Sequence, residues 1–196
     1  MKTNDLDFKK CIKEAEAFHG HICGGINMGT RMSILGMKAI GITDPKGKDS
    51  KVLMVIVEID RCATDAILAT TGCHPGKRSM KILDYGKMAA TFINLRTNKA
   101  VRIAVKNRQG DKIYTKEMIE NDPDTTDFAV IPDDELFSIM EVKVELKPEE
   151  MPGRPVRSVV CSACGERVMD AKDVARDGKI LCTPCAANTR YYKEIK

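Results

Sequence analysis

The chain has 196 residues, a formal net charge of +4, 43% hydrophobic residues and 31% charged residues. This length allows one medium domain with its own core and a small appendage, and the composition is ordinary for a soluble globular protein. Charges run through the first residues, and the longest apolar stretch, 52–57, is only long enough for a strand. We therefore expect no signal peptide, no membrane span and a cytoplasmic protein.

Two helices are predicted near the start of the chain. Apolar residues at helical spacing predict the first helix over residues 5–18, and Gly20 is placed to end it. Residues 26–41 predict a second helix rich in small residues. Because Gly29 and Gly36 lower its intrinsic helix propensity, we expect another backbone to pack closely against them.

The middle of the chain predicts a sheet. Residues 51–59 are apolar almost throughout, which favours a central strand, and a short helix of about ten residues follows within 60–72. Residues 87–95 and 100–106 predict a hairpin, and 137–146 predict a last strand. Helices early and antiparallel strands later favour an α+β fold, with the helices packed on a mainly antiparallel sheet.

A domain boundary is predicted in the stretch KPEEMPGRP (147–155), which combines three prolines, a glycine and several charges. We expect a core domain over residues 1–147, a linker over 148–156 and a small zinc finger over 157–196.

Four cysteines in the last part of the chain carry the strongest motif. Cys161 and Cys164 form one pair, Cys182 and Cys185 form the other, and seventeen residues separate the pairs. Thiolates two residues apart on a tight turn can reach one tetrahedral Zn²⁺, so we expect one structural zinc ion here. The order of knuckle, hairpin and second knuckle opening a helix resembles a treble-clef-type finger. An iron–sulfur centre and a dithiol redox pair are the alternatives.

The finger is followed by a short aromatic and basic stretch, Arg190, Tyr191, Tyr192 and Lys193. These side chains could stack on nucleic acid. We favour the interpretation that the tyrosines pack against the core or against a partner protein. Nucleic acid is a possible partner that the sequence does not favour.

A second group of metal-ligating residues is scattered over the first domain. His19, His21 and Cys23 lie within five positions, and Cys62 and Cys73 lie in loops at the ends of predicted elements. In an extended backbone, His21 and Cys23 project to the same side, and with Cys62 and Cys73 they could complete a mixed nitrogen and sulfur metal site. Alternatively, the histidines end the first helix and both later cysteines are buried small hydrophobic residues.

Further residues in these loops could take part in chemistry. Asp60, Asp65, Lys77 and Arg78 could support a metal or contact a substrate, with His19 or Asp65 moving protons. Cys11 falls on the apolar face of the first predicted helix, so we interpret it as a core thiol.

The ordered motifs FHGHICGG, RCATDA, TTGC, GKR and DYGKMAA, followed by a four-cysteine finger, resemble the FmdE family, named for the FmdE component of formylmethanofuran dehydrogenase. The resemblance covers roughly residues 15–95 and the finger. It implies an α+β core, an optional zinc finger, a homodimer and a core cleft with a bound metal, commonly zinc. The matching positions around that cleft are His19, His21, Cys23, Cys62, Asp65, Cys73 and Lys77, of which His19, Asp65 and Lys77 are the candidate catalytic residues.

The chain departs from the family pattern in two places. Family members usually carry proline where this chain has Gly24, and GCTxGK where this chain has Cys73, His74, Pro75, Gly76 and Lys77. The added imidazole of His74 could change the ligand set of the core metal.

The family name links such proteins to the reductive fixation of CO2 onto methanofuran, the first step of methanogenesis from CO2. That redox chemistry belongs to a molybdenum or tungsten pterin protein, whose cofactor 196 residues could not house. We therefore expect a metal-dependent enzyme or an accessory subunit of such an oxidoreductase. The alternatives are a dimeric zinc-finger adapter that binds protein or nucleic acid without catalysis, and, least favoured, a thiol redox protein using Cys23 and Cys73. The substrate, and whether any turnover occurs, stay open.

Overall fold

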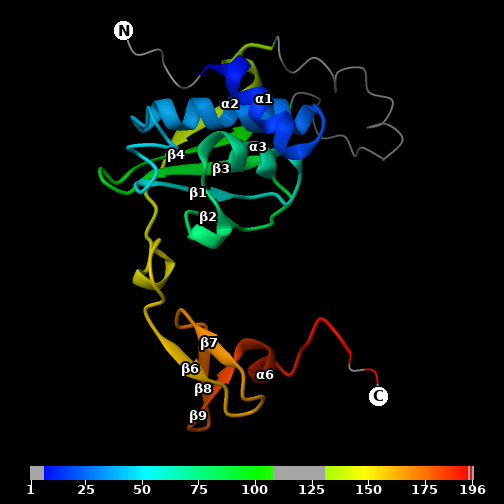
Figure 1. The fold of residues 1–196 in the computed structure, drawn as a ribbon, viewed down its shortest axis with the longest axis vertical. Helices are drawn as coiled ribbons and strands as arrows, with labels where there is room; N and C mark the ends of the chain where they lie inside the picture. The colour runs from blue at the N-terminus through cyan, green and yellow to red at the C-terminus, as the bar shows by residue number, and fades with distance from the viewer. Residues whose placement is uncertain (1–6, 108–130, 194, 196) are drawn as a thin grey trace. The chain divides into compact units, whose positions relative to one another are not determined.

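The computed structural model describes residues 7–107, 131–193 and 195, and the chain divides into two compact units, Met1–Val144 and Glu145–Lys196 (Figure 1). The stretch expected to be a linker belongs to the second unit, where it contains a short 3-10 helix, η3 (Pro148–Glu150). None of the helices in the described ranges combines the length and the apolar character needed to cross a membrane.

The first unit is built on a five-stranded sheet with the order β2-β1-β3-β4-β5. Only β1 and β2 run parallel, and the other three neighbouring pairs are antiparallel. This is the mainly antiparallel α+β arrangement that the sequence predicts. The strands are β1 (Leu53–Val57), β2 (Met80–Ile82), β3 (Ala89–Asn94), β4 (Lys99–Val105) and β5 (Phe137–Glu141).

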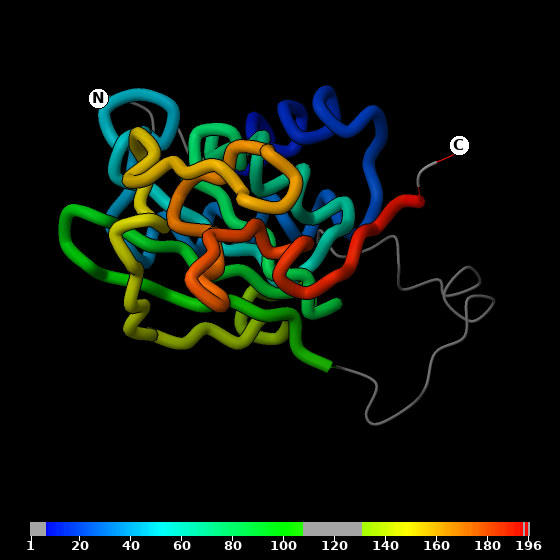
Figure 2. The backbone as a smooth tube through the Cα atoms, turned by 90° about the horizontal axis from the view of Figure 1, so that it is seen from below, coloured from blue at the N-terminus to red at the C-terminus, as the bar shows by residue number. Residues whose placement is uncertain are grey.

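Three helices cover one face of this sheet. They are α1 (Phe8–His19), α2 (Gly24–Ala39) and α3 (Cys62–Thr71), which pack on one another, while α2 also contacts β3 and β4 (Figures 1 and 2). Val55, Phe92 and Val101 lie opposite one another across three strands, so all three point to the same face. All three are buried in the main hydrophobic cluster, which fills the layer between the sheet and the helices.

The glycines of α2 mark places of close packing. A β-carbon at Gly29 would lie 2.5 Å from the carbonyl oxygen of Ala63, so α2 and α3 touch through their backbones there, as expected. At Gly36 the neighbour is the ring of Phe92 on the sheet, a side chain rather than a backbone. These contacts bring the start of α3, with Cys62, close to the start of α2.

Two strands differ from the prediction. The short strand β2 follows a run of turn-forming and basic residues, and its three residues are too few to show periodicity, so the sequence did not reveal it. The last strand ends at Glu141, five residues earlier than predicted. Beyond it, Val142 makes one more backbone hydrogen bond, to Ala100, before the chain leaves the sheet.

An ion pair spans the face of the sheet opposite the helices. Arg102 on β4 reaches across β3 and donates two hydrogen bonds, of 2.6 and 2.8 Å, to the buried carboxylate of Glu58. These hydrogen bonds hold the pKa of Glu58 below its ordinary value. The ionised carboxylate therefore adds stability above the pKa of the unfolded chain, and this stability is lost as the pH falls through the lower pKa of the folded state.

We expect Arg102→Gln to lower the free energy of unfolding by about 2 kcal/mol at pH 7, because Glu58 is left buried without its partner. The difference from the wild type should shrink at pH values below the lowered pKa of Glu58 in the folded state, because the carboxyl group is then neutral in both proteins. Urea denaturation at both pH values measures this. Arg96→Gln, at an exposed arginine 3.9 Å from Asp49, is the control and should change little. A loss that is equal at both pH values would contradict the account.

Candidate metal centres

The second unit contains two small hairpins and a short helix. Backbone pairing joins β6 to β7 and β8 to β9, and the helix α6 contacts β8 and β9. The elements are β6 (Ser158–Val160), β7 (Arg167–Met169), β8 (Asp173–Arg176), β9 (Lys179–Cys182) and α6 (Thr183–Ala187).

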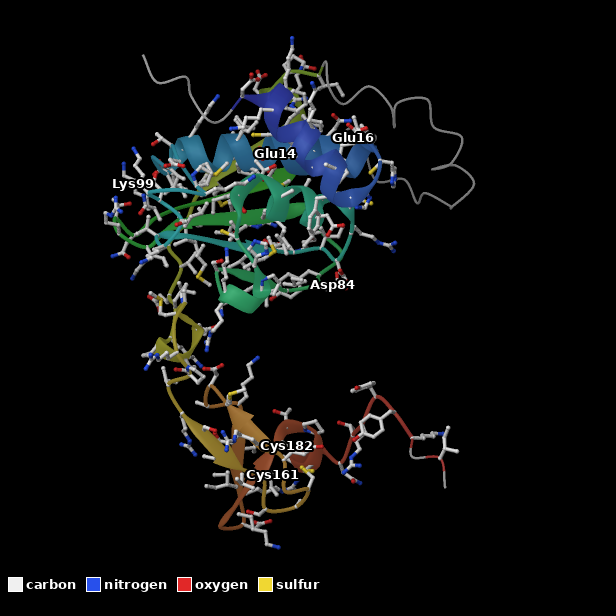
Figure 3. The ribbon with its side chains drawn as sticks, viewed as in Figure 1. Glu14, Glu16, Asp84, Lys99, Cys161 and Cys182 are labelled. Atoms are coloured by element: carbon white, nitrogen blue, oxygen red, sulfur yellow. The ribbon has the colours of Figure 1, made fainter. Side chains whose placement is uncertain are left out.

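Each cysteine pair sits at a turn between these elements. After β6 the chain turns so that the backbone N–H of Gly165 bonds to Cys161 O at 2.9 Å, and Gly165 has the φ of +76° that favours glycine. The second pair joins β9 to α6, with Cys182 at the end of the strand and Cys185 inside the helix. Cys161 and Cys182, labelled in Figure 3, come from different hairpins.

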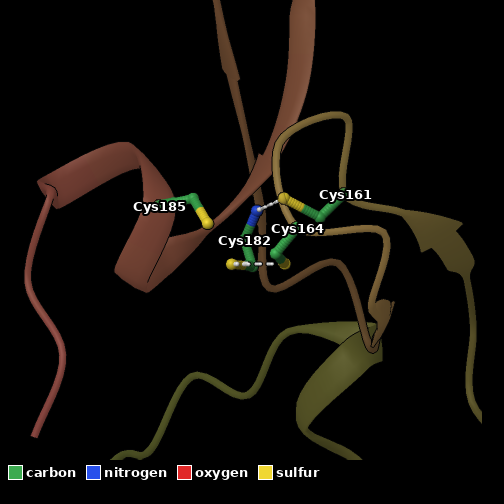
Figure 4. Close-up of side chains that lie close together, drawn as sticks. All are labelled: Cys161, Cys164, Cys182 and Cys185. Carbon is green, nitrogen blue, oxygen red and sulfur yellow. Dashed lines mark hydrogen bonds between the residues drawn. The ribbon is translucent and has the colours of Figure 1, made fainter. Parts of the chain in front are cut away.

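All four sulfur atoms of Cys161, Cys164, Cys182 and Cys185 lie within 4.8 Å of one another (Figure 4). The sulfurs of Cys164 and Cys182 are 3.9 Å apart. In a tetrahedral site with Zn–S bonds of about 2.3 Å, the sulfurs are about 3.8 Å apart. The four thiols therefore fit a zinc ion at their centre.

The electrostatics of this cluster also suit a cation. Backbone N–H groups, those of Cys164 and Cys182 foremost, lower the pKa of Cys161 to about 6. At Cys164 the N–H of Glu166 favours the thiolate, yet lost hydration and the neighbouring thiols raise the pKa to about 12. Four thiolates cannot gather here without a positive charge, and a bound dication would supply it.

The helix after the second cysteine pair is short, and an irregular tail follows it. The helix α6 ends at Ala187, and Asn188 turns the chain with a φ of +51°. The side chain of Tyr191 is fully exposed, and its ring meets that of Tyr192 edge-on at a centroid distance of 5.1 Å. The guanidinium of Arg190 lies 5.6 Å from the ring centroid of Tyr192. Tyr191 is therefore not buried against the finger.

In the first unit, His19, Cys23 and Cys62 form a second group, with one ligand atom from each within 4.8 Å of the other two. His19 is the last residue of α1, Cys23 is the N-cap of α2 and Cys62 is the first residue of α3. All three residues are half-buried. The site thus lies where the ends of three helices meet.

Local sequence explains how these ends converge. The carboxylate of Asp7 caps the start of α1, and Gly20 ends the helix with a φ of +99°. The chain reverses at Gly20 and reaches Cys23 in an extended conformation, from which α2 begins. A β-carbon at Gly25 would lie 2.9 Å from the β-carbon of Cys62, so only glycine lets the two cysteines approach.

Asp65 orients the histidine of this group. Its carboxylate oxygen lies 2.8 Å from Nδ1 of His19, and it stands in the first turn of α3, three residues after Cys62. A carboxylate at Nδ1 fixes the proton on that nitrogen and leaves the lone pair on Nε2. Nε2 of His19 is buried and has no hydrogen-bond partner among the described residues. Such a nitrogen beside two thiols is what a bound metal ion would need.

The two thiols stand at helix N-termini. Neither α2 nor α3 has a side-chain hydrogen bond at its N-cap. Burial, followed by the hydrogen bond with Cys23, raises the pKa of Cys62. A metal ion would displace this proton and complete the site.

The structure places the other predicted site residues outside this group. His21 is exposed, with its ring centroid 4.7 Å from that of His19. Cys73 is buried in the main core, where its sulfur lies 3.6 Å from the carbonyl oxygen of Leu53. Lys77 is exposed in the 3-10 helix η1 (Pro75–Lys77). His19, expected to move protons, instead stands as a candidate donor beside the two thiols.

Three residues that the sequence singled out as accessory also have defined places. Asp60 is exposed just before α3, and Arg78 follows η1 with a φ of +60°. His74, the imidazole absent from the family pattern, is half-buried, and its backbone N–H bonds to the hydroxyl of Ser79. None of these residues belongs to the group of His19.

We expect Asp65→Asn to weaken metal binding at His19, Cys23 and Cys62 by 10- to 100-fold, a typical loss for a partner of a ligating histidine. The amide cannot hold the Nδ1 proton as a carboxylate does. Zinc competition with a chromophoric chelator measures the affinity. Asp60→Asn, at an exposed carboxylate outside the group, is the matched control. An unchanged affinity in Asp65→Asn would show that His19 does not depend on this partner.

Two family models match the chain. The model described as "FmdE, Molybdenum formylmethanofuran dehydrogenase operon" matches residues 18–147, which is most of the first unit. The model described as "Prokaryotic dksA/traR C4-type zinc finger" matches residues 154–188. Both metal-ligating groups thus fall within matched segments.

Two individual proteins are similar to this chain over most of its length. A probable S-adenosyl-L-methionine-binding protein of Archaeoglobus fulgidus is 29% identical over 205 residues, and the match covers 95% of this chain. The chain spans only about half of that relative, 54% of its length. A crystal structure of a tungsten formylmethanofuran dehydrogenase FmdE-like protein from Syntrophus aciditrophicus superposes with a TM-score of 0.59 at 21% identity, covering 94% of this chain and 95% of that one. This likeness supports the fold.

Proposed function

The chain belongs to the FmdE family, and from this premise we propose that it is a metal-binding protein of the formylmethanofuran dehydrogenase FmdE type with two zinc sites. The four cysteines of the second unit hold a structural zinc ion, in a finger of the treble-clef type. His19, Cys23 and Cys62 hold a second zinc ion in the first unit.

The observation that carries the second site is that Nε2 of His19 is buried without a hydrogen-bond partner among the described residues, while a ring nitrogen of His19 lies within 4.8 Å of two thiol sulfurs. Its Nδ1 is already engaged by Asp65, so this nitrogen can act only as an acceptor of a proton or a metal ion. A buried nitrogen without any partner is costly, and a metal ion removes that cost. Two thiols and an imidazole are ligands that zinc prefers.

The number of donors separates the roles of the two sites. Four cysteines close the coordination of the finger, whereas three donors in the first unit leave one position open, as in catalytic zinc sites. A zinc ion bound there would supply Lewis-acid chemistry. Asp65 holds the proton on His19, and the exposed imidazole of His21 lies beside the site, where it can exchange protons with solvent. We therefore favour a metal-dependent enzyme or an accessory subunit over a purely structural protein.

Metal content tests this proposal. The wild-type protein should carry two zinc ions per chain, and Cys62→Ser should carry one while remaining folded. Cys73→Ser is the matched control, because its thiol lies in the core and outside the group, and it should keep both ions. One ion per chain in all three proteins would refute the second site.

The alternative is that the second unit is an adapter that binds a partner protein, and a groove beside the finger supports it. A groove of about 950 Å³ lies beside the finger cysteines and is lined also by the tail residues Arg190, Tyr191 and Tyr192. A partner protein that inserts an apolar side chain there would cover the exposed Tyr191. Homodimerisation remains a prediction from the family, and light scattering on the full chain tests it.

A further inference from the structure

The first unit contains four cysteines in two different environments. Cys11 and Cys73 are 3% and 2% exposed and belong to the hydrophobic core. Cys23 and Cys62 are half-buried at the helix ends and contact each other. An oxidant in solution can therefore reach this pair and not the two core thiols.

We propose that Cys23 and Cys62 form a reversible redox switch, in which a disulfide between them expels the metal ion from the site in the first unit. This inference rests on the proposed function, because the disulfide would regulate metal binding at the site proposed there. Oxidation would remove two of its three protein donors and leave the imidazole of His19 alone.

The geometry allows the bond to form. The two sulfur atoms start within 4.8 Å of each other and must approach to about 2.05 Å. Cys23 is the N-cap of α2 and has an extended backbone, and Gly24 and Gly25 open the helix. Because Gly25 has no β-carbon, the side chain of Cys62 approaches this helix end closely. Cys62 is the first residue of α3, so its side chain also stands at a helix end.

The chemistry balances with a peroxide as oxidant. One thiolate attacks a peroxide oxygen, the O–O bond breaks, and a sulfenic acid forms with release of water after protonation. The second thiolate then attacks the sulfenic sulfur, the S–O bond breaks, and a second water leaves as the S–S bond forms. The sulfur pair loses two electrons and the peroxide gains them. A dithiol reductant reverses the change.

The finger provides an internal comparison. Its zinc ion would have four thiolate donors, so oxidation of one pair would still leave two of them. The site of His19 has one protein donor fewer. We therefore expect peroxide to release the ion of the first unit before that of the finger.

The test uses the full chain loaded with zinc and treated with hydrogen peroxide. A chromophoric chelator should detect release of one of two ions, the intact mass should fall by about 2 Da, and a peptide map should join Cys23 to Cys62. Dithiothreitol and zinc should restore the original protein. Cys11→Ser, with a substitution at a buried thiol, should behave like the wild type, whereas Cys62→Ser should form no such link.

Three results would overturn the inference: release of the finger ion first, addition of oxygen to Cys23 without a link, or no reaction at either thiol. Treatment of the metal-free chain separates this inference from the proposed function. If the chain binds only one zinc ion, the metal site of the first unit fails. If a Cys23–Cys62 disulfide still forms in the metal-free chain, the two cysteines are a redox pair. If no such disulfide forms there, the redox pair is refuted.

Discussion

Cys182→Ser is expected to unfold the second unit and leave the first unit folded. Among the described residues of the second unit, Cys161 is the only one that is buried, so the unit has almost no apolar core of its own. Structural zinc contributes about 10–16 kcal/mol of binding free energy in comparable fingers, and that free energy is folding free energy. Loss of one thiolate from the cluster removes most of it.

Amide resonances in a nitrogen–proton correlation spectrum measure this effect for each unit separately. Those of residues 158–188 should collapse to the narrow range of an unfolded chain, while those of the sheet should keep their dispersion. Ser162→Ala is the control, since Ser162 lies between two ligands but its backbone alone is bonded, to Ile180 O. Dispersed finger resonances in Cys182→Ser would show that the hairpins fold without the metal.

Gly29→Ala should destabilise the first unit by about 2–3 kcal/mol, the usual cost of overpacking a close contact. The new methyl group would meet the carbonyl oxygen and Cα of Ala63 at 2.5 and 2.9 Å and the methyl group of Ala66 at 2.8 Å. None of these atoms can rotate away, so α3 must move. The better helix propensity of alanine, about 1 kcal/mol, offsets only part of this cost.

Thermal denaturation compares Gly29→Ala with Gly76→Ala. A β-carbon at Gly76 meets nothing within 4 Å, so that control should stay within about 0.5 kcal/mol of the wild type. Because α3 carries Cys62 and Asp65, the shift should also lower zinc affinity in the first unit. A Gly29→Ala protein as stable as the wild type would mean that α2 and α3 are less tightly packed than the structure indicates.

The parts of the fold that were predictable are those with a local signal. The apolar run of β1 and the paired strands β3 and β4 were predictable, because each buries one or both faces and its sequence shows it. The finger was predictable because the spacing of Cys161, Cys164, Cys182 and Cys185 alone specifies a tetrahedral site. The three residues of β2 carry no such signal. They pair with β1 in parallel only because α3, which lies between the two strands in the chain, returns the backbone to the sheet.

The geometry of the site in the first unit depended on where α1 ends. The expectation for His21 and Cys23 assumed an extended backbone, in which side chains two apart share a side. The helix ends at His19 with Gly20 as its cap, as predicted, and it is His19, not His21, that lies beside the cysteines. The reversal at Gly20 depends on one backbone angle, which the pattern of residue types does not specify.

Cys73 shows the same limit. Its place in a loop after α3 suggested an accessible ligand, but Gly72 caps the helix with a φ of +69° and turns the chain inward. The thiol then faces the sheet next to Leu53. Tertiary packing, not the loop position, determines the environment of Cys73. The contact of His19 with Asp65 joins residues 46 positions apart, and their spacing in the sequence does not predict it.

An anomalous difference map at the zinc absorption edge, from crystals of the full chain, tests the central claim most directly. We predict two peaks per chain, one among the four finger cysteines and one bonded to Nε2 of His19 and the sulfurs of Cys23 and Cys62. A single peak in the finger, or a second peak bonded to His21 or Cys73, would contradict the proposed site.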